Sequence, residues 1–120
     1  MPAKWIEHRG KRILYVDFRR LSPDQIRKQM KESDDMVRAA RSKVLYLGNI
    51  EDATVSGDVM GELRQYAERS VRRNFEKLAV VGAAGARKIS LDAFTRMVDR
   101  SLVQVRSFGT EAEGLDWLVQ

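Results

Sequence analysis

The sequence predicts an α/β fold in which helices cover a mainly parallel five-stranded sheet that starts with an antiparallel hairpin. Three observations carry this prediction: short apolar segments alternate with longer amphipathic ones, a glycine-containing turn joins the first two apolar segments, and the second of these lacks alternation. The element order is ββαβαβαβα, for which right-handed crossovers place successive strands parallel. Doubly wound and βα-superhelical forms both fit this order. With 120 residues, 43% of them hydrophobic, the chain has the size of one domain, residues 1–120.

The chain begins with a predicted hairpin. Trp5–His8 and Arg12–Phe18 are expected to form strands joined at Arg9-Gly10-Lys11. Within the second strand, Ile13–Val16 shows almost no alternation, which is typical of a strand covered on both faces. The hairpin therefore supplies a central strand, and His8 is expected to be an exposed residue of the edge strand.

The first helix has three start signals in succession. Ser22 is a capping hydroxyl, Pro23 occupies the first helical position and Gln25 the capping-box position. The helix is expected to end near Arg41-Ser42. Apolar residues recur along it at helical spacing and predict the face that packs on the sheet: Ile26, Met30, Val37 and Ala40.

The next unit is a buried strand, Val44–Leu47, followed by an acidic turn and a helix that opens at Ser56-Gly57. The last turns of this helix hold Arg69, Arg72 and Arg73, where cations complement the helix dipole. Its predicted inward stripe is Met60, Leu63, Ala67 and Val71.

The remaining segments complete the alternation. Leu78–Gly82 predicts a third buried strand and Ile89–Asp99 the helix after it. Val103–Phe108 is mixed in polarity and predicts an edge strand. Thr110–Glu113 matches a second capping box, opening a helix that is expected to bury Leu115, Trp117 and Leu118.

Composition narrows the function classes. The net charge of +5 arises from 22 basic and 17 acidic residues that are interspersed, without a basic stripe interleaved with aromatics, so nucleic-acid binding is not expected. The chain has no cysteine and no apolar leader, which indicates a cytoplasmic protein. Its apolar runs are too short for insertion across a membrane.

Loops at the carboxyl ends of parallel strands share one edge of a sheet, where binding sites usually lie. The strand ends predict that this edge gathers Asp17, Arg19, Asn49, Glu51, Asp52, Ser56, Gly82, Gly85 and Arg87.

One loop at this edge is a candidate anion site. Gly82, Gly85, Arg87 and Lys88 lie between a strand and a helix, where amides and the helix dipole could hold an anion. The segment matches neither a P-loop nor the dinucleotide fingerprint in its glycine spacing. A plain turn also explains it.

No catalytic constellation is found. His8 is the only histidine, which excludes a site with two histidines, and no cysteine is present to act as a nucleophile. Asp17, Glu51 and Asp52 could meet at the sheet edge but fit the acidic magnesium pocket of receiver domains poorly, so they are expected to be solvated loop charges. We therefore predict no metal, no cofactor and no enzymatic activity.

Ser56 has two interpretations. A serine before a helix is a good N-cap. A phosphate on Ser56 would also gain from the helix dipole and free amides, although Asp58 nearby would repel it.

These residues resemble the STAS superfamily, in particular its SpoIIAA-like branch, which is related in fold to bacterial anti-anti-sigma factors. The resemblance spans the chain and is most distinctive at Phe108–Leu118. Its other carriers are Trp5, Lys11–Phe18, Lys43–Leu47 and Lys77–Gly82.

The resemblance implies a bacterial regulatory protein. STAS antagonists carry Asp-Ser-Ser/Thr-Gly at a helix start, and an anti-sigma kinase phosphorylates the second hydroxyl residue. Thr54-Val55-Ser56-Gly57 occupies that place here, which makes Ser56 the possible phosphoacceptor, while Thr54 and Val55 depart from the motif. The branch is also similar in fold to CRAL-TRIO lipid-binding domains, which keep a pocket between helices and sheet.

The sequence thus predicts a regulatory domain that docks a protein partner at the sheet edge around Ser56 and through the following helix. The alternative is a binding module for a small lipid-like or anionic ligand, held under the helices or by the Gly82–Lys88 loop. Exposed edge strands would also permit a homodimer. The residues expected to contact a protein partner are Asn49, Asp52, Thr54, Ser56, Gly57 and Asp58.

Overall fold

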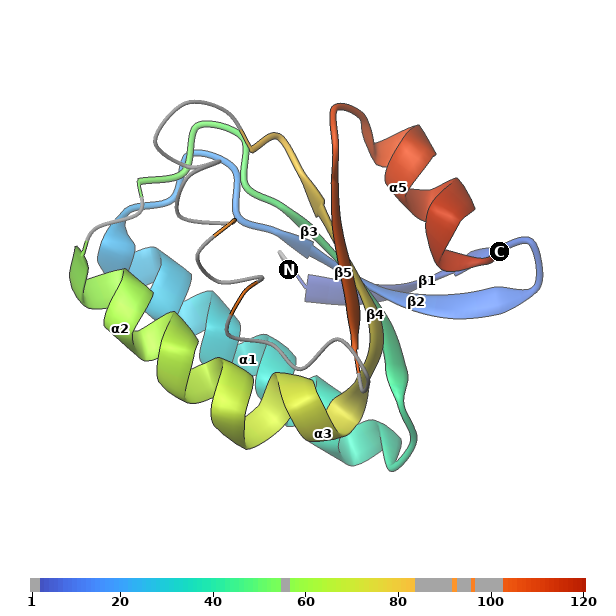
Figure 1. Ribbon diagram of the computed structural model, residues 1–120, viewed down its shortest axis with the longest axis horizontal. Coiled ribbons are helices and arrows are strands. Elements are labelled where there is room, and N and C mark those ends of the chain that lie inside the picture. The colour runs from blue at the N-terminus through green and yellow to red at the C-terminus, as the bar shows by residue number, and fades with distance from the viewer. Residues whose placement is uncertain (1–2, 55–56, 84–91, 93–95, 97–102) are drawn as a thin grey trace.

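The computed structural model describes residues 3–54, 57–83, 92, 96 and 103–120 (Figure 1). Five strands form one sheet in the order β1-β2-β3-β4-β5. β1 and β2 are antiparallel, and each later strand is parallel to its predecessor. The strands are β1 (Ala3–His8), β2 (Lys11–Asp17), β3 (Val44–Asn49), β4 (Phe75–Val81) and β5 (Gln104–Phe108).

This strand order confirms the predicted α/β class and selects between its two forms. The order runs without reversal, as in a βα-superhelical arrangement, whereas a doubly wound sheet reverses direction at a switch point. Neighbouring strands in the sheet are therefore also neighbours in the sequence. β5 lies at an edge of the described sheet, as its mixed polarity predicts.

The helices lie in two layers, one on each face of the sheet (Figure 1). One face carries α1 (Pro23–Ala40), α2 (Gly57–Tyr66), a π-helical segment η1 (Ala67–Val71) and α3 (Arg72–Asn74). The opposite face carries α5 (Glu111–Leu118). None of the helices that the structure describes is both long and apolar enough to span a membrane.

Two hydrophobic cores follow from this layering. β3 is buried along its whole length: Val44 and Tyr46 pack toward the α1 and α2 layer, and Leu45 and Leu47 pack toward α5. This explains why β3 lacks alternation in its sequence. Fully burying one such side chain stabilises the fold by about 1.5–3 kcal/mol.

The helix starts match their sequence signals to different degrees. Ser22 and Gln25 form a reciprocal capping box at the start of α1. At α5 the Thr110 hydroxyl accepts from the Glu113 amide, as expected, but it also donates to the Glu113 carboxylate at 2.9 Å. The second box is therefore incomplete, because the Glu113 side chain bonds the hydroxyl of Thr110.

Several boundaries differ from the sequence prediction. β4 begins at Phe75, three residues before the predicted start at Leu78, because Phe75 is buried and pairs with Val44. On α2, Val59 is fully buried although the predicted stripe omits it. The side chains of Met60, Leu63 and Ala67 lie outside what the structure describes, as does the predicted helix Ile89–Asp99, apart from Asp92 and Arg96, which are helical.

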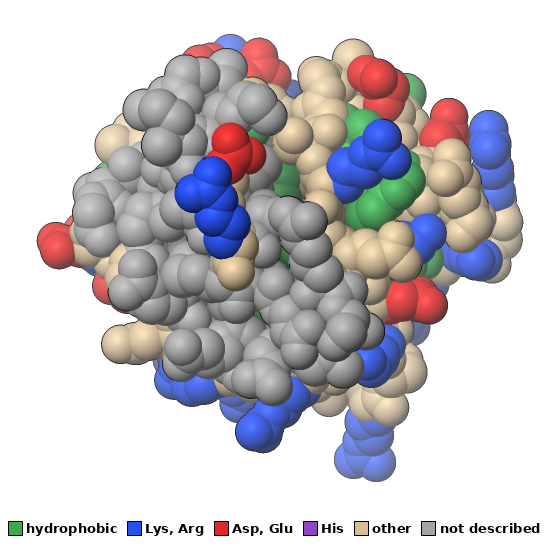
Figure 2. Space-filling model, viewed as in Figure 1, with side chains coloured by type: hydrophobic (Ala, Val, Ile, Leu, Met, Phe, Trp, Pro, Cys, Tyr) green, Lys and Arg blue, Asp and Glu red, His purple; other side chains and the backbone are tan. Residues whose placement is uncertain are grey.

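Charge is distributed over the surface in both signs. On the face seen in Figure 2, Lys and Arg side chains are spread among Asp and Glu side chains. Lys and Arg gather along the lower edge of this view, where α1, α2 and α3 lie in Figure 1.

Candidate functional site

The loops that follow β2 and β3 are hydrogen-bonded to each other and form one surface, called the rim below (residues 18–21 and 50–54). The first amide after β2 donates to the last carbonyl of β3 at 2.8 Å. The Arg20 amide donates to the Glu51 carbonyl (3.1 Å), and the Thr54 amide donates to a carbonyl of the loop before α1 (3.1 Å). These bonds continue the parallel pairing beyond the strand ends, so the two loops are held as a unit.

Each rim loop contains one residue in the left-handed backbone region, Arg20 (φ 62°) and Asp52 (φ 57°). Asp tolerates this conformation because its short side chain bonds locally, whereas for Arg it costs about 1–2 kcal/mol. The cross-loop hydrogen bonds compensate for this strain. The exposed side chains of the rim are Arg19, Arg20, Glu51, Asp52 and Thr54, and Asp58 in the first turn of α2 is also exposed.

A buried polar network supports the rim from below. Asn49 is 3% exposed; its Nδ2 donates to the Glu111 carboxylate (2.8 Å) and its Oδ1 accepts from the Glu51 amide (3.1 Å). The Tyr15 hydroxyl donates to the same carboxylate. Burial, followed by the hydrogen bond and charge of Glu111, raises the pKa of Tyr15, which keeps this hydroxyl protonated. The network connects the first turn of α5 to β2 and β3.

Asp17, the last residue of β2, forms a bidentate ion pair with Arg19 of the rim. Arg19 Nε donates to Asp17 Oδ1 (2.9 Å) and Nη2 donates to Oδ2 (2.8 Å), while the Arg19 amide adds a third bond (3.0 Å). The hydrogen bonds from Arg19 lower the pKa of Asp17 despite its partial burial. Asp17 is therefore an ionised carboxylate that is already paired with Arg19.

The structure separates the predicted contact residues into supports and exposed groups. Asn49 is a buried support, whereas Asp52, Thr54 and Asp58 are exposed. Gly57 is the first residue of α2. Ser56 lies outside the described residues.

In the Gly82–Lys88 loop, the described residues show a packing role for Gly82. Its amide donates to the Phe108 carbonyl at 3.2 Å, so this N–H does not face an open anion site. Gly82 has φ +86°, and a Cβ there would lie 2.9 Å from the backbone of Glu51. Gly85, Arg87 and Lys88 lie outside the described residues.

His8 is less exposed than the sequence predicts. Its side chain is 28% exposed, and Nε2 lies 2.9 Å from Asp116 Oδ1 on α5; Arg9 also reaches that carboxylate at 3.3 Å. The hydrogen bond with His8, followed by the charge of Arg9, lowers the pKa of Asp116. α5 lies beside the turn of the β1–β2 hairpin. The sequence does not predict this contact, because His8 and Asp116 are 108 residues apart.

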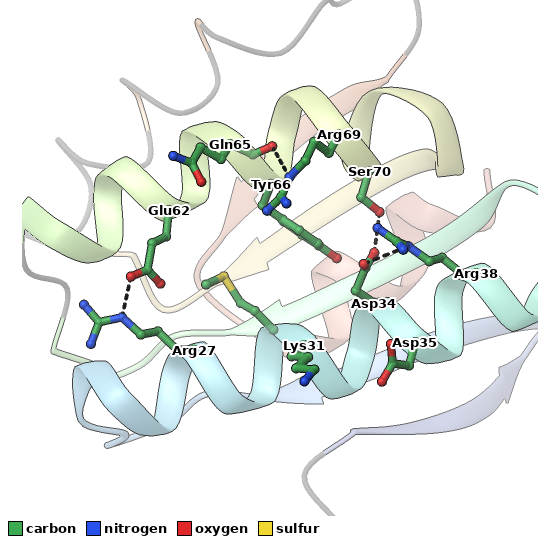
Figure 3. Close-up of a pocket in the computed structure, with 11 residues that line it drawn as sticks. Arg27, Lys31, Asp34, Asp35, Arg38, Glu62, Gln65, Tyr66, Arg69 and Ser70 are labelled. Carbon is green, nitrogen blue, oxygen red and sulfur yellow. Dashed lines mark hydrogen bonds and ion pairs between the residues drawn. The ribbon is translucent and has the colours of Figure 1, made fainter.

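A second candidate site is a groove between α1 and the α2–η1 segment, with a volume of about 550 Å³ (Figure 3). Arg27 on α1 donates to Glu62 on α2 at 2.6 Å, and Arg38 lies 3.0 Å from Asp34 within α1. The groove is lined by Arg27, Met30, Lys31, Asp34, Asp35, Arg38, Glu62, Gln65, Tyr66, Arg69 and Ser70.

Hydroxyl groups lie in the lining of this groove and in the core beneath it. Tyr46 donates to Ser33 (3.1 Å), and Ser70 donates to Asp34 across the two helices. The Tyr66 hydroxyl points toward Asp34 and Ser70, yet it is buried without a hydrogen-bond partner in the part of the chain that the structure describes (Figure 3). Burial, with the nearby Tyr46 and Asp34, raises the pKa of Tyr66, although Ser70 and Ser33 oppose this. The Tyr66 hydroxyl therefore keeps its proton at neutral pH and can donate a hydrogen bond.

The rim and the groove both combine ordered hydrogen bonds with exposed charged side chains. No three His, Asp or Glu side chains among the described residues are placed to hold a metal ion. Two carboxylates beside the rim already have protein donors, Arg19 for Asp17 and both Asn49 and Tyr15 for Glu111. These hydrogen bonds hold both carboxylates in fixed orientations.

Sequence reasoning missed the residues that connect distant elements. The sequence indicates only a capping role for Glu111 and no polar role for Tyr15, Tyr66 and Ser70. A tyrosine hydroxyl within a buried strand or helix needs a partner, so Tyr15 and Tyr66 carried a usable signal. Nothing in the local sequence identifies Glu111 as the partner of Asn49.

Comparisons with known proteins identify the fold. No protein-family model and no curated protein matches the sequence. Among solved structures, it is similar to an uncharacterised protein of the DUF3478 family from Shewanella loihica, whose crystal structure is described as having a SpoIIAA-like fold. The two chains share 12% identity at a TM-score of 0.70, covering 97% of this chain and 91% of the other. At this identity the similarity concerns the fold, so this chain has a SpoIIAA-like fold.

Proposed function

We propose that this chain is a STAS-like regulatory domain without catalytic activity, which docks a protein partner through the rim and α2. The contact surface in this proposal consists of Asp52, Thr54, Ser56, Gly57 and Asp58 together with Arg20, and Asn49 supports it from below.

One observation carries the proposal: the two rim loops are hydrogen-bonded to each other and carry exposed charges of both signs. Arg20 and Asp52 are exposed and make no ion pair among the described residues. Their backbones are fixed by the cross-loop hydrogen bonds. A surface that is already ordered loses little conformational entropy on binding, and unpaired charges are free to meet complementary groups.

The strand order favours a docking surface at this edge. In doubly wound sheets a ligand crevice opens where adjacent loops diverge at the reversal of strand order. The order β1-β2-β3-β4-β5 has no such reversal. Neighbouring loops therefore run together and form a continuous edge that suits a macromolecular partner.

Ser56 is the proposed control point of this surface. It directly precedes Gly57, where α2 begins, so a phosphate on Ser56 would meet the positive end of the helix dipole. The same phosphate would lie near Asp58 and be repelled by it. In this proposal phosphorylation weakens or redirects docking, and docking itself requires only the unmodified rim.

The test is affinity capture from cells of the native organism, followed by affinity measurements with the purified partner. Arg20→Glu and Asp52→Asn are expected to weaken binding at least about fivefold, a typical effect for contacts at a charged interface. Lys28→Glu is the matched control, because Lys28 is exposed on α1 and is not a rim residue. Ser56→Ala and Ser56→Asp test the control point.

Equal partner affinity for Arg20→Glu, Asp52→Asn, both Ser56 variants and the wild type would exclude the rim as the docking surface. A loss of affinity in Lys28→Glu as large as in Arg20→Glu would show that general charge, rather than the rim, attracts the partner.

A further inference from the structure

The groove between α1 and the α2–η1 segment has the dimensions of a small-molecule site. Its volume of about 550 Å³ falls within the usual range for ligand pockets, about 300–1,000 Å³. Met30 and the ring of Tyr66 provide apolar lining, and charged groups from both helices surround them (Figure 3). Such a mixture of apolar walls and a few polar groups is typical of sites for small organic ligands.

One end of the groove offers a hydrogen-bond donor, the hydroxyl of Tyr66. The buried Tyr66 hydroxyl has no partner among the described residues, which is unfavourable for a buried polar group. Asp34 lies at the same end and accepts from Ser70 and Arg38. A carboxylate has about four acceptor positions, so Asp34 retains capacity for one further donor. A ligand hydroxyl could accept from Tyr66 and donate to Asp34.

The mouth of the groove favours an anion. The lining side chains include four cations and three carboxylates, and the pairs Arg27–Glu62 and Arg38–Asp34 neutralise two of each. Lys31 and Arg69 remain against Asp35, so the unpaired charge is positive by one. Lys31 on α1 and Arg69 on η1 are exposed and in no ion pair within the described residues. Both have long, flexible side chains that can turn toward an anion held between the two helices.

The local backbone gives this end of the groove an unusual shape. η1 is a π-helical segment, Ala67–Val71, and it carries Arg69 and Ser70. π-helical turns are rare, cost stability relative to the α-helix and occur frequently at functional sites. Here the segment places the Ser70 hydroxyl on Asp34 and the Arg69 side chain at the mouth.

We propose that this groove binds a small organic acid with a hydroxyl at the opposite end of an apolar body. The hydroxyl lies between Tyr66 and Asp34, the body packs on Met30 and the Tyr66 ring, and the carboxylate lies between Lys31 and Arg69. None of the residues that line this groove belongs to the rim. The outcome of a ligand-binding test here is therefore independent of whether a protein partner docks at the rim.

The test is a titration of the ¹⁵N-labelled full chain, followed by NMR, with 4-hydroxybenzoate as the probe. This molecule has a hydroxyl and a carboxylate at opposite ends of an apolar ring. We expect shifts at the amides of Lys31, Asp34, Arg69 and Ser70. Benzoate, which lacks the hydroxyl, and 4-hydroxybenzyl alcohol, which lacks the charge, should each bind about fivefold more weakly or worse, and tyramine should cause no shifts.

Two sets of variants assign the contacts. Tyr66→Phe should lower the affinity for 4-hydroxybenzoate about tenfold and leave the affinity for benzoate unchanged, because only 4-hydroxybenzoate accepts a hydrogen bond from the Tyr66 hydroxyl. The melting temperature of the free variant should not fall, since that hydroxyl has no described partner in the free protein. Lys31→Gln and Arg69→Gln should weaken both acids about threefold or more, whereas Lys28→Gln, on the same helix but outside the groove, should not.

Three results would overturn the proposal. The first is no shift at a probe concentration on the order of 10 mM, which excludes useful affinity. The second is tyramine binding as tightly as the acid. The third is unchanged 4-hydroxybenzoate affinity in Tyr66→Phe, with the melting temperature lowered, which would make the hydroxyl a structural group.

Discussion

The backbone conformation of a single residue, Gly82, allows the loop after β4 to lie close to the rim. Arg20 and Asp52 adopt left-handed conformations in adjacent loops, and Gly82 does so in the next loop along the edge. Glycine is required only at Gly82, because a side chain there would contact the Glu51 backbone. The residue at this position therefore affects the rim although it belongs to another loop.

Gly82→Ala and Gly10→Ala separate steric contact from backbone strain. Both glycines have similar positive φ values, +86° and +81°, but a Cβ at Gly10 meets nothing within 4 Å. We expect a loss of about 1 kcal/mol for Gly10→Ala and about 2–4 kcal/mol for Gly82→Ala, measured by urea unfolding. Equal losses would mean that the loop moves away from Glu51 at little cost.

The Asp17–Arg19 pair should contribute a pH-dependent part of the stability. Because the pKa of Asp17 is lowered in the folded state, its contribution is fully present above the pKa of the unfolded chain, about 4, and is lost as pH falls through the folded value. Asp17→Asn should therefore reduce stability at pH 7 by up to about 1 kcal/mol and lose less stability than wild type on acidification to pH 3.

Asp35→Asn is the matched control for this pH experiment, since Asp35 makes no ion pair in the described part of the chain. Urea unfolding at several pH values gives both curves. An Asp17→Asn curve parallel to that of the wild type would show that the pair forms equally well in the unfolded chain.

At the scale of elements, helix starts are encoded locally and helix interiors depend on packing. The start of α1 follows from Ser22, Pro23 and Gln25 alone, and all three adopt the predicted roles. The predicted continuous helix from Gly57 onward is instead interrupted by η1 before α3. A π-helical turn has no simple sequence signature, because it depends on how Ser70 and Val71 pack against the neighbouring elements.

Ser22→Ala should destabilise the protein by about 1 kcal/mol through loss of the α1 capping box. Ser42→Ala is the control, because the Ser42 hydroxyl only reaches the Ala40 carbonyl beyond the helix end, at 3.4 Å. Thermal or urea unfolding measures both variants. If Ser42→Ala were equally destabilising, the effect could not be assigned to the cap.

At the scale of the whole molecule, the sheet class and strand directions were predictable because apolar runs and turn residues encode them. The rim was predictable in part: parallel strands place Asp17, Asn49 and Glu51 at one edge, as observed. The partners of these groups were not predictable, since Glu111 reaches Asn49 only when α5 packs on the opposite face. The groove likewise depends on the spacing of two helices that packing alone determines.

The two tryptophans report on opposite faces of the sheet. Trp5 packs against the α1 and α2 side, and Trp117 on α5 is buried on the other side. Because both layers share one sheet, we expect them to unfold together. Trp5→Phe and Trp117→Phe each leave one tryptophan, and in each variant the fluorescence midpoint in urea should coincide with the midpoint from far-ultraviolet circular dichroism. An earlier fluorescence transition in Trp5→Phe would show that α5 detaches first.

The uninterrupted strand order also has a consequence for synthesis on the ribosome. Each strand pairs with the one made just before it, so no strand must wait for a later segment to fill a gap in the sheet. β1 to β4 can pair once the chain has been made as far as Val81 and has left the ribosome, and each new strand then joins an existing edge. The sheet can thus grow in one direction with the nascent chain, and α5 closes the second face last.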